Sequence, residues 1–515
     1  MRTEKAIKNS ITSMIGNIIS FLVSFIAQAI FIRILGAEYL GLNGLFTNIL
    51  TMLSIFELGI GNAIVFNMYK PIAENNIPKI KSLMNFYKKA YRLIMIIIFT
   101  FGIILLPFLK YIVGEVSIDI NIYIVYILFL LSTLSSYVIA YKRNLIIANQ
   151  ENYIINLIHS IYIIAFNVAQ LMIIYFTKNY YLYLVVKIVC QLLENFIIGL
   201  IANYKYRYIT EGKIEKLDKE TEKDIFSRVK ALIFHKVGAI IIFGTDNIII
   251  STFFGIIQVG LYTNYYTIIN AINTLFGQII SSATANVGNL IVKEKTEKLY
   301  STFKKMRFLN SWISIFTGVS LLVMVQPFIK LWVGAEYLLG IDVVIVIVFN
   351  YFQKMQRNAY STFKDSAGIW REDKFVPLVE SGLNIIFSII FLKIFGLVGV
   401  FMGTVVSGLV LWCYSYPKFV YKKLFNRTYK EYAKETLGYI SLFVVIAAIT
   451  YGISIMIVVN NTLIQLLINS ILCIIIPNAI MFLIFRKSEN FEYFKELIFK
   501  GLSKIKTKIL KPKRV

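Results

Sequence analysis

Long apolar stretches alternate with short polar segments along almost the whole chain. A helix needs about 20 apolar residues to cross the hydrocarbon core of a bilayer. Runs of this kind lie near 11–32, 42–67, 91–113, 120–140, 153–176, 180–202, 232–253 and 259–287. Further runs lie near 308–328, 341–362, 375–392, 399–420, 437–458 and 463–485. The pattern predicts an all-α polytopic membrane protein with about fourteen transmembrane helices.

The amino-acid composition agrees with this pattern. Hydrophobic residues make up 58% of the 515 residues and charged residues only 16%, whereas a soluble globular protein carries about 25% charged residues. The chain therefore has too few polar side chains to cover soluble domains, and lipid must surround most of it. The net charge of +25 does not indicate a nucleic-acid partner, because the basic residues form short clusters between apolar runs.

The positions of Lys and Arg predict the orientation of the helices. Basic residues concentrate in the cytoplasmic loops of membrane proteins, and most of the 53 Lys and Arg residues lie in loops on one side. The opposite loops contain Arg33, Lys110, Lys178, Lys330 and Lys393. This asymmetry predicts an even number of spans with both termini in the cytoplasm.

The spacing of the runs predicts a division into lobes. The outer loops are short, and the one longer loop, Asn203–Lys230, is charged and lies near the middle of the chain. We expect an N-lobe of six helices, a cytoplasmic linker, a C-lobe of six helices, two further helices and a tail. Their expected bounds are 1–205, 206–231, 232–425, 426–486 and 487–515.

Short motifs recur at matching positions of the two lobes. Gly36, Gly41 and Leu42 match Gly255, Gly260 and Leu261. Tyr87-Lys88-Lys89 matches Phe303-Lys304-Lys305, and Tyr141-Lys142 matches Phe363-Lys364. The matches indicate an internal repeat. Because each copy has an even number of helices, both copies face the same way, and the predicted axis between them runs along the membrane normal.

The tail has a helical pattern of its own. Apolar residues recur at spacings of three and four, with lysines among them. They are Phe491, Phe494, Ile498, Leu502, Ile505 and Ile509. The pattern favours a basic amphipathic helix on the anionic inner surface of the membrane. The alternative is a partly disordered, solvated tail.

Several motifs resemble those of a known family. They are Arg33 to Phe46 (RILGAEYLGLNGLF), Glu57 to Ala63 (ELGIGNA), Lys142-Arg143-Asn144 and Thr245 to Ser251 (TDNIIIS). They resemble the bacterial polysaccharide-biosynthesis flippases, which carry lipid-linked O-antigen or capsule repeat units. This family belongs to the multidrug/oligosaccharidyl-lipid/polysaccharide exporter superfamily.

The resemblance implies a V-shaped carrier whose central cavity opens alternately to each side of the bacterial cytoplasmic membrane. The implied cargo is an undecaprenyl-pyrophosphate-linked oligosaccharide. The implied coupling ion is H⁺ or Na⁺, no cofactor is implied, and a polysaccharide polymerase and glycosyltransferases are the implied partners besides membrane lipids.

The most polar stretch within any predicted span contains Gln353, Lys354 and Arg357. A charged side chain at mid-membrane costs at least about 2.5–3.5 kcal/mol, so it should face a cavity or a partner. A cluster of donors suits a pyrophosphate and sugar hydroxyls, because Arg grips phosphate through two parallel bonds. The alternative is that this helix emerges early into the cytoplasm, which would make these ordinary loop charges.

Lys187 and Glu194 lie about two turns apart on one predicted helix and share a face. They either line a polar cavity or pair with neighbouring helices. Arg33, at the outer end of the first run, is the remaining basic candidate for substrate binding.

Two deep acids, Glu57 and Asp246, are candidates for coupling-ion sites. A buried carboxylate shifts toward its protonated form and can carry a proton between two accessible states. The alternative for each is a hydrogen bond between helices. Asp342 and Glu380 lie near helix ends and are expected to reach the interface, and a core hydrogen bond is the favoured role for His159.

No catalytic or metal-binding constellation is visible. The three cysteines, Cys190, Cys413 and Cys473, lie far apart inside apolar runs, and the chain has two histidines. We therefore expect a transporter. A membrane glycosyltransferase or O-antigen polymerase is the alternative outside this class, but the sizeable outer domain that such an enzyme usually needs is missing.

Two other kinds of carrier remain possible within the superfamily. A lipid II flippase should show several arginines in the first two helices, whereas only Arg33 is found there, at the outer end. A multidrug antiporter is the third candidate, and the deep basic groups weigh against a cationic cargo.

Overall fold

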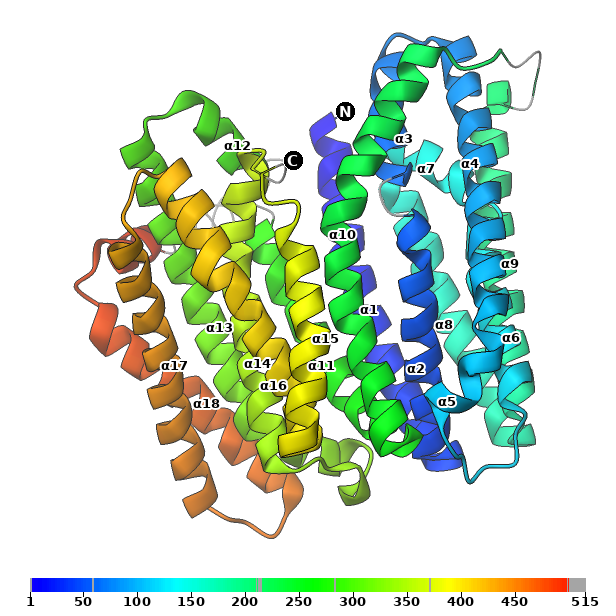
Figure 1. Cartoon of the computed structure of the whole chain (residues 1–515). Coiled ribbons are helices and arrows are strands. Elements are labelled where there is room, and N and C mark those ends of the chain that lie inside the picture. Colours follow the sequence, from blue (N-terminus) through cyan, green and yellow to red (C-terminus); the bar gives the residue numbers. More distant parts are fainter. Residues whose placement is uncertain are drawn as a thin grey trace, which may run out of the picture. The chain divides into compact units, whose positions relative to one another are not determined.

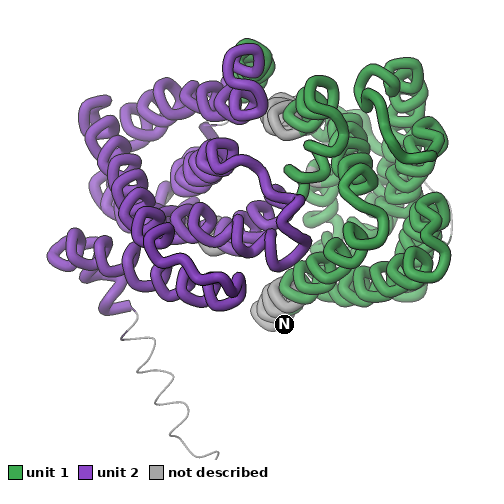
Figure 2. The backbone as a smooth tube through the Cα atoms, turned by 90° about the horizontal axis from the view of Figure 1, so that it is seen from below, with its two compact units in different colours: residues 1–263, 377–390 green, residues 264–376, 391–515 purple. Residues whose placement is uncertain are grey.

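The computed structural model describes residues 2–57, 60–209, 211, 215–281, 284–369, 372–497 and 499. Within these residues all regular structure is helical, in agreement with the predicted fold class. The chain divides into two compact units (Figure 2). Unit 1 contains Met1–Thr263 and Pro377–Ile390, and unit 2 contains Asn264–Val376 and Phe391–Val515.

Unit 1 is built mainly from the first ten α-helices (Figure 1). They are α1 (Arg2–Leu35), α2 (Ala37–Leu53), α3 (Ile60–Ala73), α4 (Ile77–Ile104), α5 (Leu109–Val113), α6 (Ile122–Tyr137), α7 (Ala140–Ala148), α8 (Asn152–Thr177), α9 (Tyr180–Lys205) and α10 (Lys219–Phe254). Short 3-10 helices η1 (Ser54–Glu57), η2 (Leu106–Phe108) and η3 (Arg207–Ile209) connect some of them. Asparagine caps begin several helices: the side chains of Asn76, Asn121 and Asn179 accept hydrogen bonds from backbone N–H groups of the first turn.

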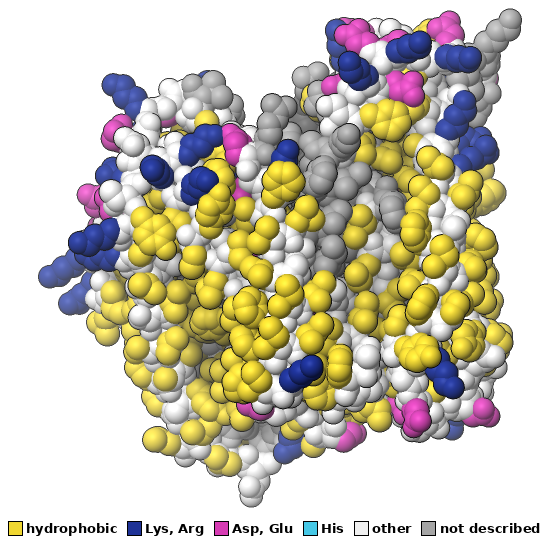
Figure 3. Space-filling model, in the orientation of Figure 1, with side chains coloured by type: hydrophobic (Ala, Val, Ile, Leu, Met, Phe, Trp, Pro, Cys, Tyr) yellow, Lys and Arg dark blue, Asp and Glu magenta, His cyan; other side chains and the backbone are white. Residues whose placement is uncertain are grey.

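Unit 2 is organised around α13 (Thr296–Trp332), which packs against α14 (Ile341–Ser366), α17 (Tyr429–Met456) and α18 (Thr462–Phe485). The other elements are α12 (Thr284–Lys293), the 3-10 helix η4 (Ala335–Tyr337), α16 (Leu397–Val410) and the π-helix η5 (Leu411–Leu424). Two helices are shared between the units: α11 (Ile256–Ser281) and α15 (Val376–Phe395). On the visible faces, hydrophobic side chains cover the helix middles and Lys and Arg gather at helix ends (Figure 3).

The described part of the chain contains ten helices that are long and apolar enough to cross a membrane. The predicted total of about fourteen therefore stays a prediction. The run expected at 42–67 is not one helix, because α2 ends at Leu53 and α3 begins at Ile60. Polar residues explain part of this break: Ser54 Oγ bonds back to the Leu50 carbonyl at 2.9 Å, and Glu57 ends η1.

The predicted linker at 206–231 is only partly a loop. The helix α10 begins at Lys219, with the Asp218 side chain accepting from the Thr221 N–H as its N-cap. Acidic residues Glu220 and Glu222 occupy its first turn, where the helix dipole favours negative charge. These local signals extend the helix beyond its apolar run, so hydropathy alone misplaces its start.

The repeated glycine motifs meet in space within unit 1. A Cβ atom on Gly41 would lie 2.1 Å from the Ile256 carbonyl oxygen, and one on Gly260 would lie 2.2 Å from the Ala37 carbonyl oxygen. The contact is reciprocal, since each glycine faces the residue that follows the first glycine of the other motif. A reciprocal contact is what a local two-fold relation between two copies produces.

Part of the tail lies against α13. Phe491 stacks on Trp312 with ring centroids 5.9 Å apart, and Phe494 stacks on Phe308 at 6.2 Å. These are the first two apolar positions of the predicted amphipathic pattern. The others, Ile498, Leu502, Ile505 and Ile509, lie outside the described residues.

Candidate functional site

The polar stretch of α14 packs against α16 in unit 2. Gln353 is fully buried and its Nε2 donates to the Val405 carbonyl at 3.1 Å. A Cβ on Gly408 would lie 2.4 Å from Arg357 Nη2 and 2.7 Å from Gln353 Oε1. Both side chains therefore lie over the bare backbone of this glycine. The buried Gln353 Oε1 accepts no hydrogen bond from any residue that the structure describes.

The opposite side of the same stretch is tied to α13. Gln356 accepts from Ser311 Oγ at 3.1 Å and donates to Ser314 Oγ at 2.6 Å, and Asn310 Nδ2 donates to the Met355 carbonyl at 2.9 Å. Lys354 is half-buried and close enough to Arg357 for charge repulsion between them. The structure thus brings Gln353, Lys354 and Arg357 together on a helix that continues for about two turns beyond Arg357.

Lys187 lines a separate small cavity in unit 1. Its ammonium lies 5.0 Å from the centroid of the Phe129 ring. The cavity has a volume of about 100 Å³, and five hydroxyl side chains line it with Lys187: Thr47, Thr51, Ser54, Ser132 and Thr133. A cationic group among hydroxyls can bind a small polar or anionic group.

Glu194 has a different environment from Lys187 although both lie on α9. It is buried, and its Oε1 lies 2.8 Å from Arg143 Nη2 on α7 and 3.0 Å from His159 Nδ1 on α8. Glu194 therefore joins three helices of unit 1. The expectation of a core hydrogen bond for His159 is wrong in part: the hydrogen bond is present, but the His159 side chain is 47% exposed and does not lie in the core.

The two candidate coupling-ion acids also lie in unit 1. Glu57 ends η1 and accepts a hydrogen bond from Tyr91 Oη at 3.0 Å, and Tyr91 lies 3.5 Å from Tyr87 Oη. Asp246 is buried on α10, beside Thr245, whose hydroxyl bonds Asn384 Oδ1 at 3.2 Å. Arg33 lies exposed in the last turn of α1.

One buried cluster was not predicted from the sequence. Arg307 is 2% exposed; it bonds Glu435 Oε2 at 2.5 Å, Thr436 Oγ1 at 2.9 Å and Tyr421 Oη. Arg307 follows Lys304 and Lys305 in the sequence. Because basic residues cluster in loops, the sequence gives no reason to expect that Arg307 is buried. No local sequence signal marks its burial, because the surrounding tyrosines come from distant positions, among them Tyr360, whose ring centroid lies 5.2 Å from the guanidinium.

The described side chains contain no group of three or more His, Cys, Asp or Glu placed to hold a metal ion. What the site offers is a set of hydrogen-bond donors and charges held among membrane-crossing helices. This arrangement can bind a polar group.

The chain belongs to the polysaccharide biosynthesis protein family, whose pattern matches residues 6–285, more than half of the chain. Ten helices of its described part are long and apolar enough to cross a membrane, so the chain is a multi-pass membrane protein of this family. A comparison with curated protein sequences found no match.

Solved structures of three carriers share the fold. The lipid II flippase MurJ in an inward closed conformation is 16% identical, with a TM-score of 0.64 over 92% of this chain and 99% of that one. An inward-facing MATE multidrug resistance transporter is 15% identical, with a TM-score of 0.57 over 78% of this chain and 94% of that one. The Vibrio cholerae MATE transporter VcmN, in a mutant form, is 12% identical, with a TM-score of 0.52 over 83% of this chain and 99% of that one.

Proposed function

We propose that this protein moves undecaprenyl-pyrophosphate-linked oligosaccharide units from the inner to the outer leaflet of the bacterial cytoplasmic membrane by alternating access. The observation that carries the proposal is the pair Gln353 and Arg357 over Gly408, with Lys354 nearby on the same helix, in a chain of the polysaccharide biosynthesis family. Such a cargo needs a polar site for its charged head, while its tail can stay in lipid.

The chemistry of the cluster suits a pyrophosphate. The guanidinium of Arg357 can form two parallel bonds to phosphate oxygens, and Lys354 adds a second positive charge nearby. Gly408 has no side chain to occupy the space above its backbone, so polar heads from α14 reach it. The Gln353 Oε1, which accepts no hydrogen bond within the described chain, can accept one from a sugar hydroxyl.

Transport against a gradient requires an energy source, and H⁺ or Na⁺ coupling at Glu57 or Asp246 would supply it. Glu57 accepts a hydrogen bond from Tyr91 Oη, and Asp246 is buried on α10. Only an ion that binds the two conformations with different affinity can bias them. Glycosyltransferases would act before this step, and a polysaccharide polymerase would act after it.

A lipid II cargo is the second candidate, because MurJ is named as a lipid II flippase and shares the fold. In the first two helices of the described chain, Arg33 is the basic group at the outer end and α2 contains no arginine. The side chains on α14 that would bind a pyrophosphate suit either cargo. The two candidate cargoes therefore differ in the sugar part, which this cluster does not distinguish.

Deletion of the gene tests the proposal in cells. Undecaprenyl-linked repeat units should accumulate on the cytoplasmic side, the surface polymer should be lost, and peptidoglycan synthesis should continue. Accumulation of single units on the outer face would indicate a polymerase instead, and accumulation of lipid II would indicate the second cargo.

A further inference from the structure

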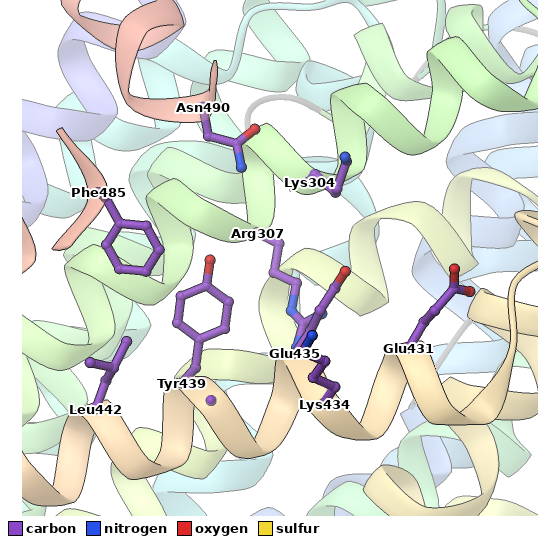
Figure 4. A pocket seen from close by; sticks show the side chains of 10 residues that line it. Lys304, Arg307, Glu431, Lys434, Glu435, Tyr439, Leu442, Phe485 and Asn490 are labelled. Atoms are coloured by element: carbon purple, nitrogen blue, oxygen red, sulfur yellow. The ribbon is translucent and has the colours of Figure 1, made fainter. Parts of the chain in front are cut away.

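A second cavity lies in unit 2, between α13, α17 and the segment that follows α18 (Figure 4). Its volume is about 510 Å³. One face of α17 forms its long wall and changes in character along the helix, from Lys434 through Tyr439 to Leu442. Phe485 closes the apolar end, whereas Lys304 and Asn490 lie at the polar end.

The polar end of this cavity has an excess of positive charge. Its two carboxylates are already engaged: Glu435 is paired with the buried Arg307 at 2.5 Å, and Glu431 forms the capping box of α17 with Thr428. Lys304 and Lys434 form no ion pair with any carboxylate of the described chain. The Lys304 ammonium lies 5.3 Å from the centroid of the Tyr300 ring, and Lys434 is exposed.

The cavity lies where these helices leave the apolar layer. The α17 helix begins at Tyr429, and the basic residues Lys422 and Lys423 come before it. The α18 helix ends at Phe485, and the basic residues Arg486 and Lys487 follow it. The positive-inside rule makes this the cytoplasmic end. A ligand that enters here from the membrane meets ammonium groups at the headgroup level and apolar side chains one to two turns deeper.

We propose that this cavity binds an anionic glycerophospholipid of the inner leaflet, with its phosphate between Lys304 and Lys434 and an acyl chain along Leu442 and Phe485. Charge complementarity selects the phosphate, and the apolar end favours a lipid over a soluble phosphate ester. The proposal does not depend on the identity of the transported cargo, because the cavity lies on α13 and α17 and the cargo cluster lies on α14 and α16.

The buried Arg307 gives the cavity a route to the transport helices. Its guanidinium is paired with Glu435 on the cavity wall and lies 5.2 Å from the centroid of the Tyr360 ring. Tyr360 is about one turn from Arg357 on α14. Arg307 thus joins the cavity wall on α17 to the ring of Tyr360 on α14.

The test uses the full-length protein in detergent, with retained lipids counted by native mass spectrometry. Phosphatidylglycerol should be retained in preference to phosphatidylcholine, and glycerol phosphate should not compete. The double variant Lys304→Gln, Lys434→Gln should lose about tenfold or more of its apparent affinity for phosphatidylglycerol, because two charge-assisted contacts are removed. The control Lys430→Gln, Lys487→Gln removes the same charge at the same membrane face without touching the cavity and should retain wild-type affinity.

A second variant tests the apolar end. Leu442→Asn should weaken phosphatidylglycerol retention while both lysines remain in place. Equal retention by the double variant and its control would overturn the proposal. Equal retention of phosphatidylcholine and phosphatidylglycerol would do so as well, and competition by glycerol phosphate would mean that the cavity takes a free phosphate. Preferential retention of undecaprenyl pyrophosphate over phosphatidylglycerol would assign the cavity to cargo instead.

Discussion

Arg357 and Gln353 lie over Gly408. This contact determines which effects a substitution at the candidate cargo site should have. Arg357 is half-buried, so its charge is not freely solvated, and Gln353 is anchored to the Val405 carbonyl. The site therefore combines a fixed amide with a cation that can reach a ligand. Losing the cation should remove binding without removing the packing of α14 on α16.

At this scale we predict that Arg357→Gln lowers transport roughly ten- to a hundredfold, because a charge-assisted bond to phosphate contributes about 1.5–3 kcal/mol. Membrane abundance should stay near that of the wild type. Arg357→Lys should recover part of the activity, since an ammonium cannot make the planar two-bond grip. Surface polysaccharide measured alongside protein level checks this, with Lys393→Gln on the outer side as the control. Full activity of Arg357→Gln at normal abundance would contradict the binding role.

The partners of individual buried side chains are the feature that the sequence predicts least well. The sequence places Glu194 within an apolar run, but its partners Arg143 and His159 come from two other helices, and no local pattern encodes that meeting. Arg307 was hidden for the opposite reason: it follows two lysines, and its burial depends on tyrosines from helices far along the chain. Tertiary packing decides which side chains from different helices become partners in a bundle. The hydrophobic periodicity of one helix carries no information on this.

Elements were predicted better, because a membrane-crossing helix is specified by a local property. The runs at 153–176 and 180–202 lie within α8 and α9 almost residue for residue. Prediction failed where polar residues interrupt or extend a run, as between α2 and α3 and at the start of α10. There, backbone capping by Ser54 or Asp218 decides where the helix stops or begins.

The glycine contact between α2 and the start of α11 gives a prediction at the scale of elements. We predict that the substitutions Gly41→Ala and Gly260→Ala each lower the free energy of unfolding by about 1–3 kcal/mol. The new Cβ atom would overlap a backbone carbonyl that cannot rotate away. The reciprocal geometry predicts similar losses for the two variants. Gly452→Ala is the control, since its Cβ would meet open space. Thermal unfolding of the purified protein measures the three, and a Gly41→Ala variant as stable as Gly452→Ala would contradict the close approach.

For the whole molecule, the alternation of basic and non-basic loops predicts the orientation in the membrane. In a background without Cys190, Cys413 and Cys473, single cysteines at Glu115, Asn179 and Asn460 should react with an impermeant thiol reagent in intact cells. Cysteines at Asn76, Lys216 and Lys430 should react only after the cells are opened. Labelling of the second set in intact cells would invert the orientation.

The central claim is that this chain by itself moves a lipid-linked oligosaccharide across a bilayer, and reconstitution tests it most directly. The purified protein would be placed in liposomes that contain undecaprenyl-pyrophosphate oligosaccharide, and the outward-facing fraction would be measured with an impermeant sugar-binding reagent. Wild-type protein should raise the rate at which inner-leaflet cargo becomes accessible, with a proton or sodium gradient increasing it further, and Arg357→Gln should abolish most of the increase. Accessibility that rises no faster than in protein-free liposomes, under either gradient, would contradict the account.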